Sequence, residues 1–290
     1  MFIPGNNPGM LQDAAILGAD SIILDLEDAV SLTEKDSARI LVREAIKTID
    51  YSQVEVVVRV NPLDTEFGAV DVDMMARVQP DMLLIPKANE EEIKLVDALL
   101  AKIEQEEGFA PGSIQLMALI ETAVGLENVY NVINSSKRVA GVLLGGEDLT
   151  TDLGIKRTKE GEEIFYARNK VATACRALKV DSIDTPFTDT NDFEGLTRDT
   201  SKAKSLGLTG KSAINPRQID VIHSVFAPTE AELKQALRIL DAMENAKKEG
   251  KGVFSLDGKM VDAPIITRAA RMVELGQQLG LIERGKDNDN

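Results

Sequence analysis

Charged side chains follow the apolar runs of this sequence at the points where the runs end, and the first such run sets the pattern. Residues 21–24 consist of a serine and three aliphatic residues, and Asp25, Glu27 and Asp28 come directly after them. A continuous apolar run of this kind is typical of a buried parallel strand. Because unpaired carboxylates are too costly to bury, these three acids either face solvent in an ordinary loop or surround a cation.

The same arrangement recurs at the ends of later apolar runs. Parallel strands of a barrel bring their carboxyl ends to one face of the molecule. Acids and bases at the ends of five or more strands therefore converge on one pocket. The residues concerned are Arg59, Lys87, Glu121, Glu147, Asp148 and Asn215.

Glu121 and Asp148 are the best candidates for metal ligands, because each follows an apolar run and the two predicted strands are neighbours. Two carboxylates plus several waters suit Mg²⁺, and the absence of a His/Cys cluster argues against zinc. Gly145 and Gly146 remove side chains beside Asp148, so that backbone N–H groups can approach an anionic ligand. The alternative for the two acids is a buried salt bridge with Arg59 or Lys87.

The only histidine and the only cysteine are poor candidates for catalysis. His223 falls in a predicted helix, where a surface or capping role is favoured over that of a general base. Acid–base chemistry must then use carboxylates, lysine or water. Cys175 falls in a helical pattern that indicates a buried core thiol, and a single cysteine fits a reducing compartment.

The composition of the chain argues against nucleic acids and membranes as partners. The chain has 290 residues, of which 43% are hydrophobic, and its net charge is −15. This charge argues against nucleic-acid binding, which needs a basic surface. No apolar run approaches the roughly 20 residues of a membrane span, and no signal-peptide pattern opens the chain. We therefore expect a cytoplasmic protein that does not bind membranes.

Eight predicted strands alternate with helices over the first 225 residues or so, which is typical of a (β/α)8 TIM barrel. The alternative is an open doubly wound sheet, which predicts a Gly-rich phosphate turn after the first strand; residues 5–9 match it poorly. The predicted strands occupy residues 1–5, 21–26, 54–61, 82–87, 115–121, 139–148, 182–186 and 209–214.

The pattern changes near residue 250. A predicted helix over residues 229–247 completes a catalytic barrel domain at residues 1–248. Residues 252–260 predict a hairpin that turns at Asp257-Gly258, and a helix follows over residues 264–281. Residues 249–290 thus form a C-terminal hairpin-plus-helix extension, with a frayed polar end at 285–290. We expect this extension to pack on its own barrel or on a neighbouring subunit.

Several segments at the strand ends resemble those of the citrate lyase β-subunit branch of the citrate lyase/malyl-CoA lyase/aldolase superfamily. The similarity covers almost the whole chain. The segments that carry it are residues 2–10, 25–30, 59–61, 85–87, 145–148 and 210–216, together with 151–153, 165–168 and 258–262.

The resemblance implies a metal-dependent carbon–carbon lyase with a TIM-barrel fold. In such proteins the arginine of the third strand binds substrate, here Arg59. The glutamate after the fifth strand and the aspartate of the Gly-x-Glu-Asp motif hold Mg²⁺, which gives those roles to Glu121 and Asp148. The other predicted site residues are Lys87, Gly146 and Asn215 for substrate binding, and Asp25, Glu27 and Asp28 for orienting metal-bound waters.

Residues 258–262 resemble the family segment whose aspartate reaches the active site of an adjacent subunit. The resemblance therefore implies that Asp262 is a catalytic acid/base acting across a subunit interface. The alternative is a helix N-cap, a role that Asp262 would serve well just before Ala263-Pro264.

We predict cleavage of a citryl thioester, carried on an acyl carrier protein or on CoA, into oxaloacetate and an acetyl thioester. The resemblance implies citrate lyase α (transferase) and γ (acyl carrier) subunits as partners, and a homo-oligomer such as a trimer. The alternatives are a malyl-CoA lyase or malate-synthase-like enzyme and a non-catalytic scaffold. A pyruvate aldolase is less favoured, since that branch relies on an active-site histidine.

Three basic residues, Lys156, Arg157 and Lys159, follow the sixth predicted strand in a loop that should rise from the catalytic face. We expect this loop to bind the phosphate of a phosphopantetheine arm. The alternative is a solvated loop whose charges are offset by neighbours such as Asp152 and Glu160.

Overall fold

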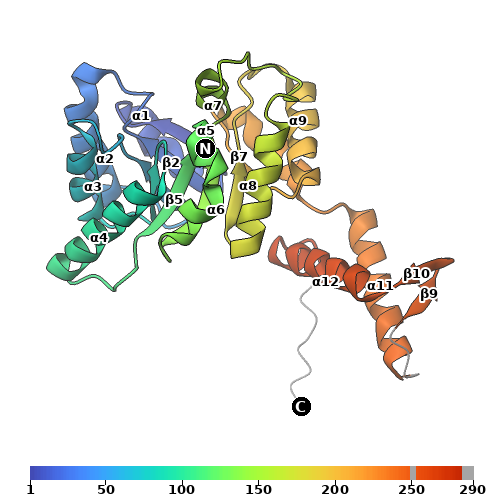
Figure 1. The fold of residues 1–290 in the computed structure, drawn as a ribbon. Helices are drawn as coiled ribbons and strands as arrows, with labels where there is room; N and C mark the ends of the chain where they lie inside the picture. The colour runs from blue at the N-terminus through green and yellow to red at the C-terminus, as the bar shows by residue number, and fades with distance from the viewer. Residues whose placement is uncertain (249–252, 283–290) are drawn as a thin grey trace. The chain divides into compact units, whose positions relative to one another are not determined.

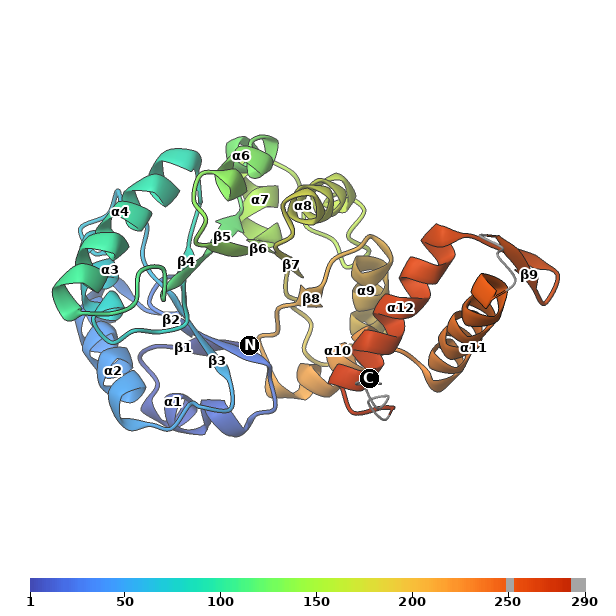
Figure 2. The same cartoon turned by 90° about the horizontal axis from the view of Figure 1, so that it is seen from below.

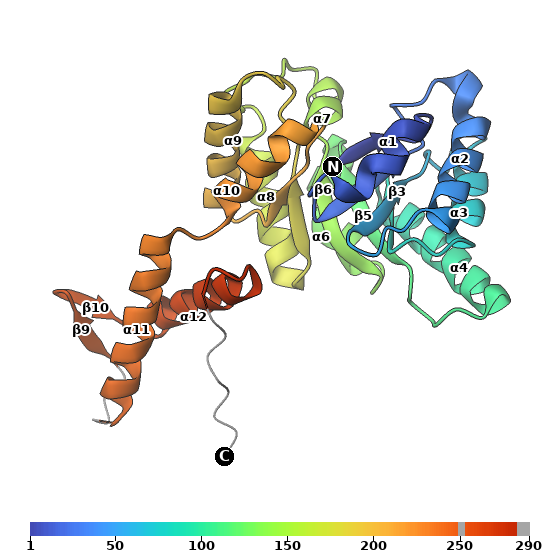
Figure 3. The same ribbon diagram turned by 180° about the vertical axis from the view of Figure 1, so that it is seen from behind.

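The computed structural model describes residues 1–248 and 253–282. The chain forms two compact units, Met1–Ile222 and His223–Asn290. Figure 1 and, from behind, Figure 3 show the strands and helices of each unit.

Eight parallel strands in sequential order, β1 to β8, form the first unit. The backbone N–H of Phe2 in β1 donates to the carbonyl of Ala213, just past β8, at 2.9 Å. First and last strands are therefore joined, and Figure 2 shows the strands inside a ring of helices. The TIM barrel is confirmed and the open sheet is excluded. The strands are β1 (Phe2–Pro4), β2 (Ser21–Asp25), β3 (Glu55–Arg59), β4 (Met82–Ile85), β5 (Gln115–Ile120), β6 (Val139–Leu144), β7 (Asp181–Asp184) and β8 (Gly210–Lys211).

Aliphatic side chains fill the barrel, as the near-absence of alternation in the strands predicted. One cluster of buried residues comprises Ile23, Val57, Met82, Leu84, Met117, Leu119 and Leu143. With this interior filled, polar side chains at the carboxyl ends of the strands remain above the core.

The helices of the first unit follow their strands closely. The sequence of residues 90–107 predicts a helix with one charged and one apolar face. This helix is confirmed at both ends, because Asn89 accepts from the N–H groups of Glu91 and Glu92 and Gly108 adopts a φ of 74°. The helices are α1 (Pro8–Asp13), α2 (Lys35–Thr48), α3 (Gly68–Ala76), α4 (Glu90–Glu107), α5 (Ala123–Glu127), α6 (Val129–Asn134), α7 (Gly146–Asp152), α8 (Phe165–Leu178) and α9 (Phe193–Ser205), with short 3-10 turns η1 (Ala14–Ile16), η2 (Leu32–Glu34) and η3 (Pro216–Gln218). Helix α10 (Ile219–Phe226) spans the boundary between the two units.

The sixth strand ends earlier than predicted. β6 stops at Leu144, and α7 starts at Gly146, so Glu147 and Asp148 lie in the first turn of a helix and not at the end of a strand. A Cβ on Gly145 would lie 2.6 Å from the Cβ of Glu121. Only glycine can make the turn here, and it converts strand to helix within one residue.

The second unit contains α11 (Glu230–Lys248), β9 (Phe254–Leu256), β10 (Lys259–Val261) and α12 (Ala263–Gln278). The predicted hairpin is confirmed, with positive φ angles at Asp257 (53°) and Gly258 (74°), as a type I′ turn requires. Residues 249–252 and the predicted frayed end at 285–290 lie outside the described residues.

The boundary between the units differs from the predicted one at residue 248. Ala236 of α11 packs against Ala269 and Val273 of α12. The apolar face of α11 is thus covered by the extension, which places this helix in the second unit instead of the barrel domain. Within residues 1–248 and 253–282, no helix combines the length and the apolar character that crossing a bilayer requires.

A buried ion pair joins α4 to the start of β6. Arg138 donates to both carboxylate oxygens of Glu104, at 2.6 and 2.7 Å, and the N–H groups of Gly112 and Ile114 donate to the same carboxylate. The hydrogen bonds from Arg138 are the main reason that the pKa of Glu104 falls from 4.5 to about 2. A carboxylate with a lowered pKa stabilises the fold above its unfolded pKa and loses that contribution as the pH falls.

We predict that Glu104→Gln lowers the free energy of unfolding by about 3 kcal/mol at pH 7, as the pKa shift implies. The difference from the parent should shrink to about half by pH 3, since the stabilisation is lost between pH 4.5 and about 2. Urea unfolding at both pH values measures it. The control is Glu106→Gln on the same helix, whose exposed pair with Arg77 should contribute less than about 1 kcal/mol. Equal losses in the two variants would contradict this account.

Candidate active site

A cavity of about 470 Å³ opens at the carboxyl ends of the strands in the first unit. Residues that are far apart in the sequence line it, as the predicted convergence of strand ends requires. Its charged lining residues are Asp25, Asp28, Arg59, Glu121, Glu147 and Asp148, and its apolar ones include Phe2, Met10, Leu119, Leu143 and Ile214.

A bidentate ion pair between Arg59 and Asp25 forms one wall. Arg59 Nε lies 2.7 Å from Asp25 Oδ1, and Nη2 lies 2.6 Å from Oδ2. The two residues are direct partners in the β2–β3 register, which makes this geometry a consequence of strand pairing. Asp25 also accepts from the N–H groups of Glu27 and Ala29. These backbone hydrogen bonds fix the carboxylate of Asp25, and the fixed carboxylate in turn orients the guanidinium of Arg59.

The third nitrogen of the guanidinium faces the loop after β2. Arg59 Nη1 lies 3.0 Å from Glu27 Oε2 and 3.3 Å from Asp28 Oδ2. Burial raises the pKa of Glu27 to about 7; the positive charge of Arg59 opposes the rise, and the carboxylates of Asp28 and Asp25 add to it. Glu27 is thus a carboxyl group that can exchange a proton near neutral pH.

Lys35 holds this loop, a role that the sequence did not reveal. Its Nζ donates to the carbonyls of Leu26 and Glu27 at 2.8 and 2.6 Å. A lysine in the first turn of a helix is usually solvated, so its type and position gave no signal.

Glu121 lies just past β5 and is only 3% exposed. Its Oε1 accepts from the backbone N–H of Lys87 at 2.8 Å. Burial raises the pKa of Glu121 to about 8; the carboxylate of Glu27 adds to the rise, the N–H of Lys87 opposes it, and Asp148 raises it further. Because Glu121 is buried near other carboxylates, its negative charge is stabilised by a bound proton or a bound cation.

Two residues predicted to bind substrate have other contacts. Lys87 adopts a φ of 46°, which directs its N–H to Glu121, while its exposed side chain is not among the cavity-lining residues. Asn215 caps η3: its side chain accepts from the N–H of Arg217, and the Gln218 side chain accepts from the N–H of Asn215. The neighbouring Ile214 lines the cavity in its place.

Gly146 and Asp148 reach the cavity from the first turn of α7. The N–H of Gly146, which we expected to be free for an anion, donates to Thr185 Oγ1 at 3.0 Å. Asp148 is exposed on the cavity side of the helix. Gly146 therefore borders the site, but its N–H is already used within the protein.

The donor set fits Mg²⁺. Among the described residues, neither Glu121 nor Asp148 forms an ion pair, and Arg59 is held by Asp25, so the salt-bridge alternative is wrong. No group of three or more His, Cys, Asp or Glu side chains that could hold a metal occurs in the part of the chain that the structure describes. Two carboxylates that line one cavity, beside space for water and substrate oxygens, match Mg²⁺ and not a zinc site.

Comparison with known proteins identifies the family, because the sequence model of the protein family described as HpcH/HpaI aldolase/citrate lyase matches residues 1–216. The chain belongs to this family. A citrate lyase subunit beta from Leuconostoc mesenteroides subsp. cremoris is 45% identical over 284 residues, covering 98% of this chain and 94% of that protein. The resemblance inferred from the strand-end motifs is thereby confirmed.

Solved structures agree in fold. The protein CitE from Mycobacterium tuberculosis, in complex with magnesium, acetoacetate and coenzyme A, is 28% identical with a TM-score of 0.79, covering 94% of this chain and 95% of that chain. A citrate lyase beta subunit from M. tuberculosis, complexed with oxaloacetate and magnesium, is also 28% identical, with a TM-score of 0.66 and coverage of 79% and 96%.

The loop that carries Lys156, Arg157 and Lys159 has most of its positive charge paired with carboxylates. Arg157 pairs with Glu163 at 2.6 Å, and Lys159 pairs with Asp189 at 2.5 Å. These partners differ from the acids suggested by the sequence, because the loop folds toward α8 and α9. The contacts favour a solvated loop with offset charges over a phosphate-binding loop.

Three remaining predictions concern side chains away from the strand ends. Cys175 is buried, and burial raises the pKa of its thiol to about 12, which confirms a core role. His223 lies in the last turn of α10. Asp262 is the N-cap of α12 and accepts from the N–H of Ile265. The capping alternative for Asp262 is thus confirmed, and it leaves the predicted catalytic role open to experiment.

We predict that Mg²⁺ binding displaces a proton from Glu121. Because burial raises the pKa of Glu121 to about 8, the protonated form dominates below that pH and the ionised form above it. The apparent affinity for Mg²⁺ should therefore fall about tenfold per pH unit below pH 8 and level off above it. Calorimetric titration with MgCl2 at several pH values, in buffers of different ionisation enthalpy, measures both affinity and proton release.

Glu121→Gln should abolish this binding, whereas Glu127→Gln, which alters an exposed acid paired with Lys170, should leave it unchanged. An affinity that does not vary between pH 6.5 and pH 8.5 would contradict the prediction.

Proposed function

We propose that this chain is a Mg²⁺-dependent lyase that cleaves a citryl thioester into oxaloacetate and an acetyl thioester, as the β subunit of a citrate lyase. One observation carries the proposal: Glu121 and Asp148 face the same cavity as an Arg59 that is locked by Asp25. The printed descriptions of the relatives, which name citrate lyase subunit beta, magnesium and oxaloacetate, support the choice of substrate.

Glu121 and Asp148 would hold Mg²⁺, which supplies Lewis-acid stabilisation of substrate oxygens. A carboxylate or water at the site takes the proton of the tertiary hydroxyl of the citryl group. The oxygen then forms the carbonyl of oxaloacetate as the carbon–carbon bond breaks, and the electron pair of that bond passes to the thioester enolate. Arg59, with two of its nitrogens fixed on Asp25, offers a preoriented positive charge to a substrate carboxylate or to the enolate. The enolate carbon then takes a proton to give the acetyl thioester.

We assign this last proton transfer to Asp262 of a neighbouring subunit. Within residues 1–248 and 253–282, the N–H of Ile265 donates to one carboxylate oxygen of Asp262, and we assign the proton transfer to the other oxygen. A site completed in this way makes activity depend on a homo-oligomer. The proposal includes an acyl carrier protein or CoA as the thioester carrier, and citrate lyase α and γ subunits as partners.

The substrate can be tested directly. With Mg²⁺, the purified chain should release oxaloacetate from a citryl thioester, and EDTA should stop the reaction. Asp148→Asn should lower kcat by at least about a hundredfold, because it removes a charged metal ligand, without loss of cooperative unfolding, since Asp148 is exposed. Asp152→Asn at the end of the same helix is the control. Keto-acid release only from a malyl thioester would favour the malyl-CoA lyase alternative, and no turnover of any thioester would favour a scaffold.

Subunit mixing tests the role of Asp262. Asp262→Ala and Glu121→Gln chains should each be inactive, but hybrids should recover part of the parent activity, because some sites then combine an intact Glu121 with an intact Asp262. Tagged chains verify that hybrids form. Hybrids that form and remain inactive would show that Asp262 serves only as the helix cap.

A further inference from the structure

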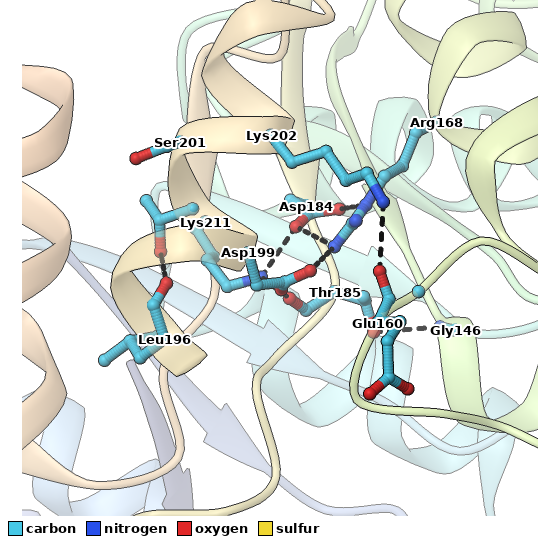
Figure 4. A network of polar contacts seen from close by, with 12 residues as sticks. Gly146, Glu160, Arg168, Asp184, Thr185, Leu196, Asp199, Ser201, Lys202 and Lys211 are labelled. Atoms are coloured by element: carbon cyan, nitrogen blue, oxygen red, sulfur yellow. Dashed lines mark hydrogen bonds and ion pairs between the residues drawn. The ribbon is translucent and has the colours of Figure 1, made fainter. Parts of the chain in front are cut away.

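Four charged side chains are buried together beside the cavity in the first unit (Figure 4). Arg168 of α8 donates to both carboxylate oxygens of Asp184, at 2.8 Å each, and to Asp199 of α9 at 2.7 Å. Lys211 of β8 donates to Asp184 at 2.6 Å and to Asp199 at 2.7 Å. Two cations and two anions make a cluster with no net charge.

This cluster gives a role to two segments that the sequence singled out, residues 165–168 and 210–216. Arg168 is 0% exposed, so its charge is tolerable only because carboxylates surround it. Burial by itself would raise the pKa of Asp199, but Lys211 and Arg168 bring it below its usual value, so the carboxylate stays ionised. Nη1 of Arg168 is buried without a hydrogen-bond partner, but the other contacts of the cluster join α8, α9 and the ends of β7 and β8 and so fix the relative positions of these elements.

The cluster extends to the active site through Thr185. Lys211 Nζ also donates to the carbonyl of Thr185 at 2.7 Å. The hydroxyl Oγ1 of Thr185 in turn accepts from the N–H of Gly146 at 3.0 Å, as Figure 4 shows. Gly146 is the first residue of α7, and Asp148 lies in the same turn.

The contact between Thr185 and the start of α7 is close. A Cβ on Gly146 would lie 2.8 Å from Thr185 Oγ1, so the helix cannot carry a side chain at this position without moving. Thr185 borders the cavity, but it is 0% exposed and its hydroxyl oxygen accepts from the N–H of Gly146. We therefore expect its effect on chemistry to pass through α7.

We propose that Thr185 is a positioning residue for Mg²⁺ binding: anchored by the buried charge cluster, it holds the N–H of Gly146, fixes the start of α7 and so places the carboxylate of Asp148. The inference rests on the proposed function only in taking Asp148 as a metal ligand. Partners that orient metal ligands typically contribute 10–100-fold to metal affinity.

The test is Mg²⁺ binding without substrate, measured by calorimetric titration with MgCl2. Thr185→Val keeps the shape of the side chain but cannot accept the hydrogen bond, and it should weaken Mg²⁺ binding by about tenfold or more. Thr185→Ser keeps the hydroxyl and should bind within about threefold of the parent.

Thr200→Val is the matched control. Thr200 is equally buried, but its hydroxyl donates to the carbonyl of Leu196 within α9. This variant should lose thermal stability comparably to Thr185→Val while keeping the parent's Mg²⁺ affinity. A merely structural effect of removing a buried hydroxyl would change both variants alike.

Gly146→Ala provides a second route if Thr185→Val fails to fold. It retains the hydroxyl but places a methyl group against it, and it should weaken Mg²⁺ binding to a similar degree by displacing the start of α7. Parent-like Mg²⁺ affinity in a folded Thr185→Val, or in Gly146→Ala, would overturn the inference while leaving the proposed function intact. A parent chain that binds no Mg²⁺ would overturn the proposed function, and the inference with it.

Discussion

The bidentate ion pair between Arg59 and Asp25 is the interaction around which the candidate site is arranged. It joins the ends of two adjacent strands, and strand register alone brings its members face to face. Because Asp25 occupies two nitrogens of the guanidinium, the third is left toward Glu27 and Asp28. The same pairing keeps Arg59 from neutralising Glu121, so the charge of that acid is left for a ligand to balance.

Two groups of buried charges in this barrel differ in their balance. The cluster of Arg168, Lys211, Asp184 and Asp199 pairs each cation with two anions, so its charges balance without a ligand. Around the cavity, carboxylates outnumber the cations that reach them. Burial raises the pKa of Glu27 to about 7 and that of Glu121 to about 8, and neighbouring carboxylates add to both rises. A balanced cluster rigidifies a scaffold, whereas an excess of buried negative charge recruits a cation. The cluster of Arg168, Lys211, Asp184 and Asp199 supports the carboxylates of the cavity through Thr185 and α7.

Glycine makes the close packing at this site possible. Side chains at Gly145 or Gly146 would collide with Glu121 or Thr185, and the chain passes from strand to helix between these two residues. The consequence is that a metal-ligand candidate is carried by a helix only seven residues long. Its position depends on contacts from the neighbouring strands more than on the helix itself, because so short a helix has little stability of its own.

The sequence by itself determined the barrel, the limits of α4, the hairpin turn and the candidates Arg59, Glu121 and Asp148. These follow from local signals: unbroken apolar runs, capping residues, an Asp-Gly turn and charged residues at strand ends. Only the tertiary structure decided how those groups are used. Asp25 forms an ion pair with Arg59, and Glu121 accepts from the N–H of Lys87. Thr185 accepts from the N–H of Gly146, and α11 belongs to the second unit. Each of these outcomes depends on strand register, on a backbone angle or on a loop path, and such pairings join groups whose separation along the chain carries no periodic signal.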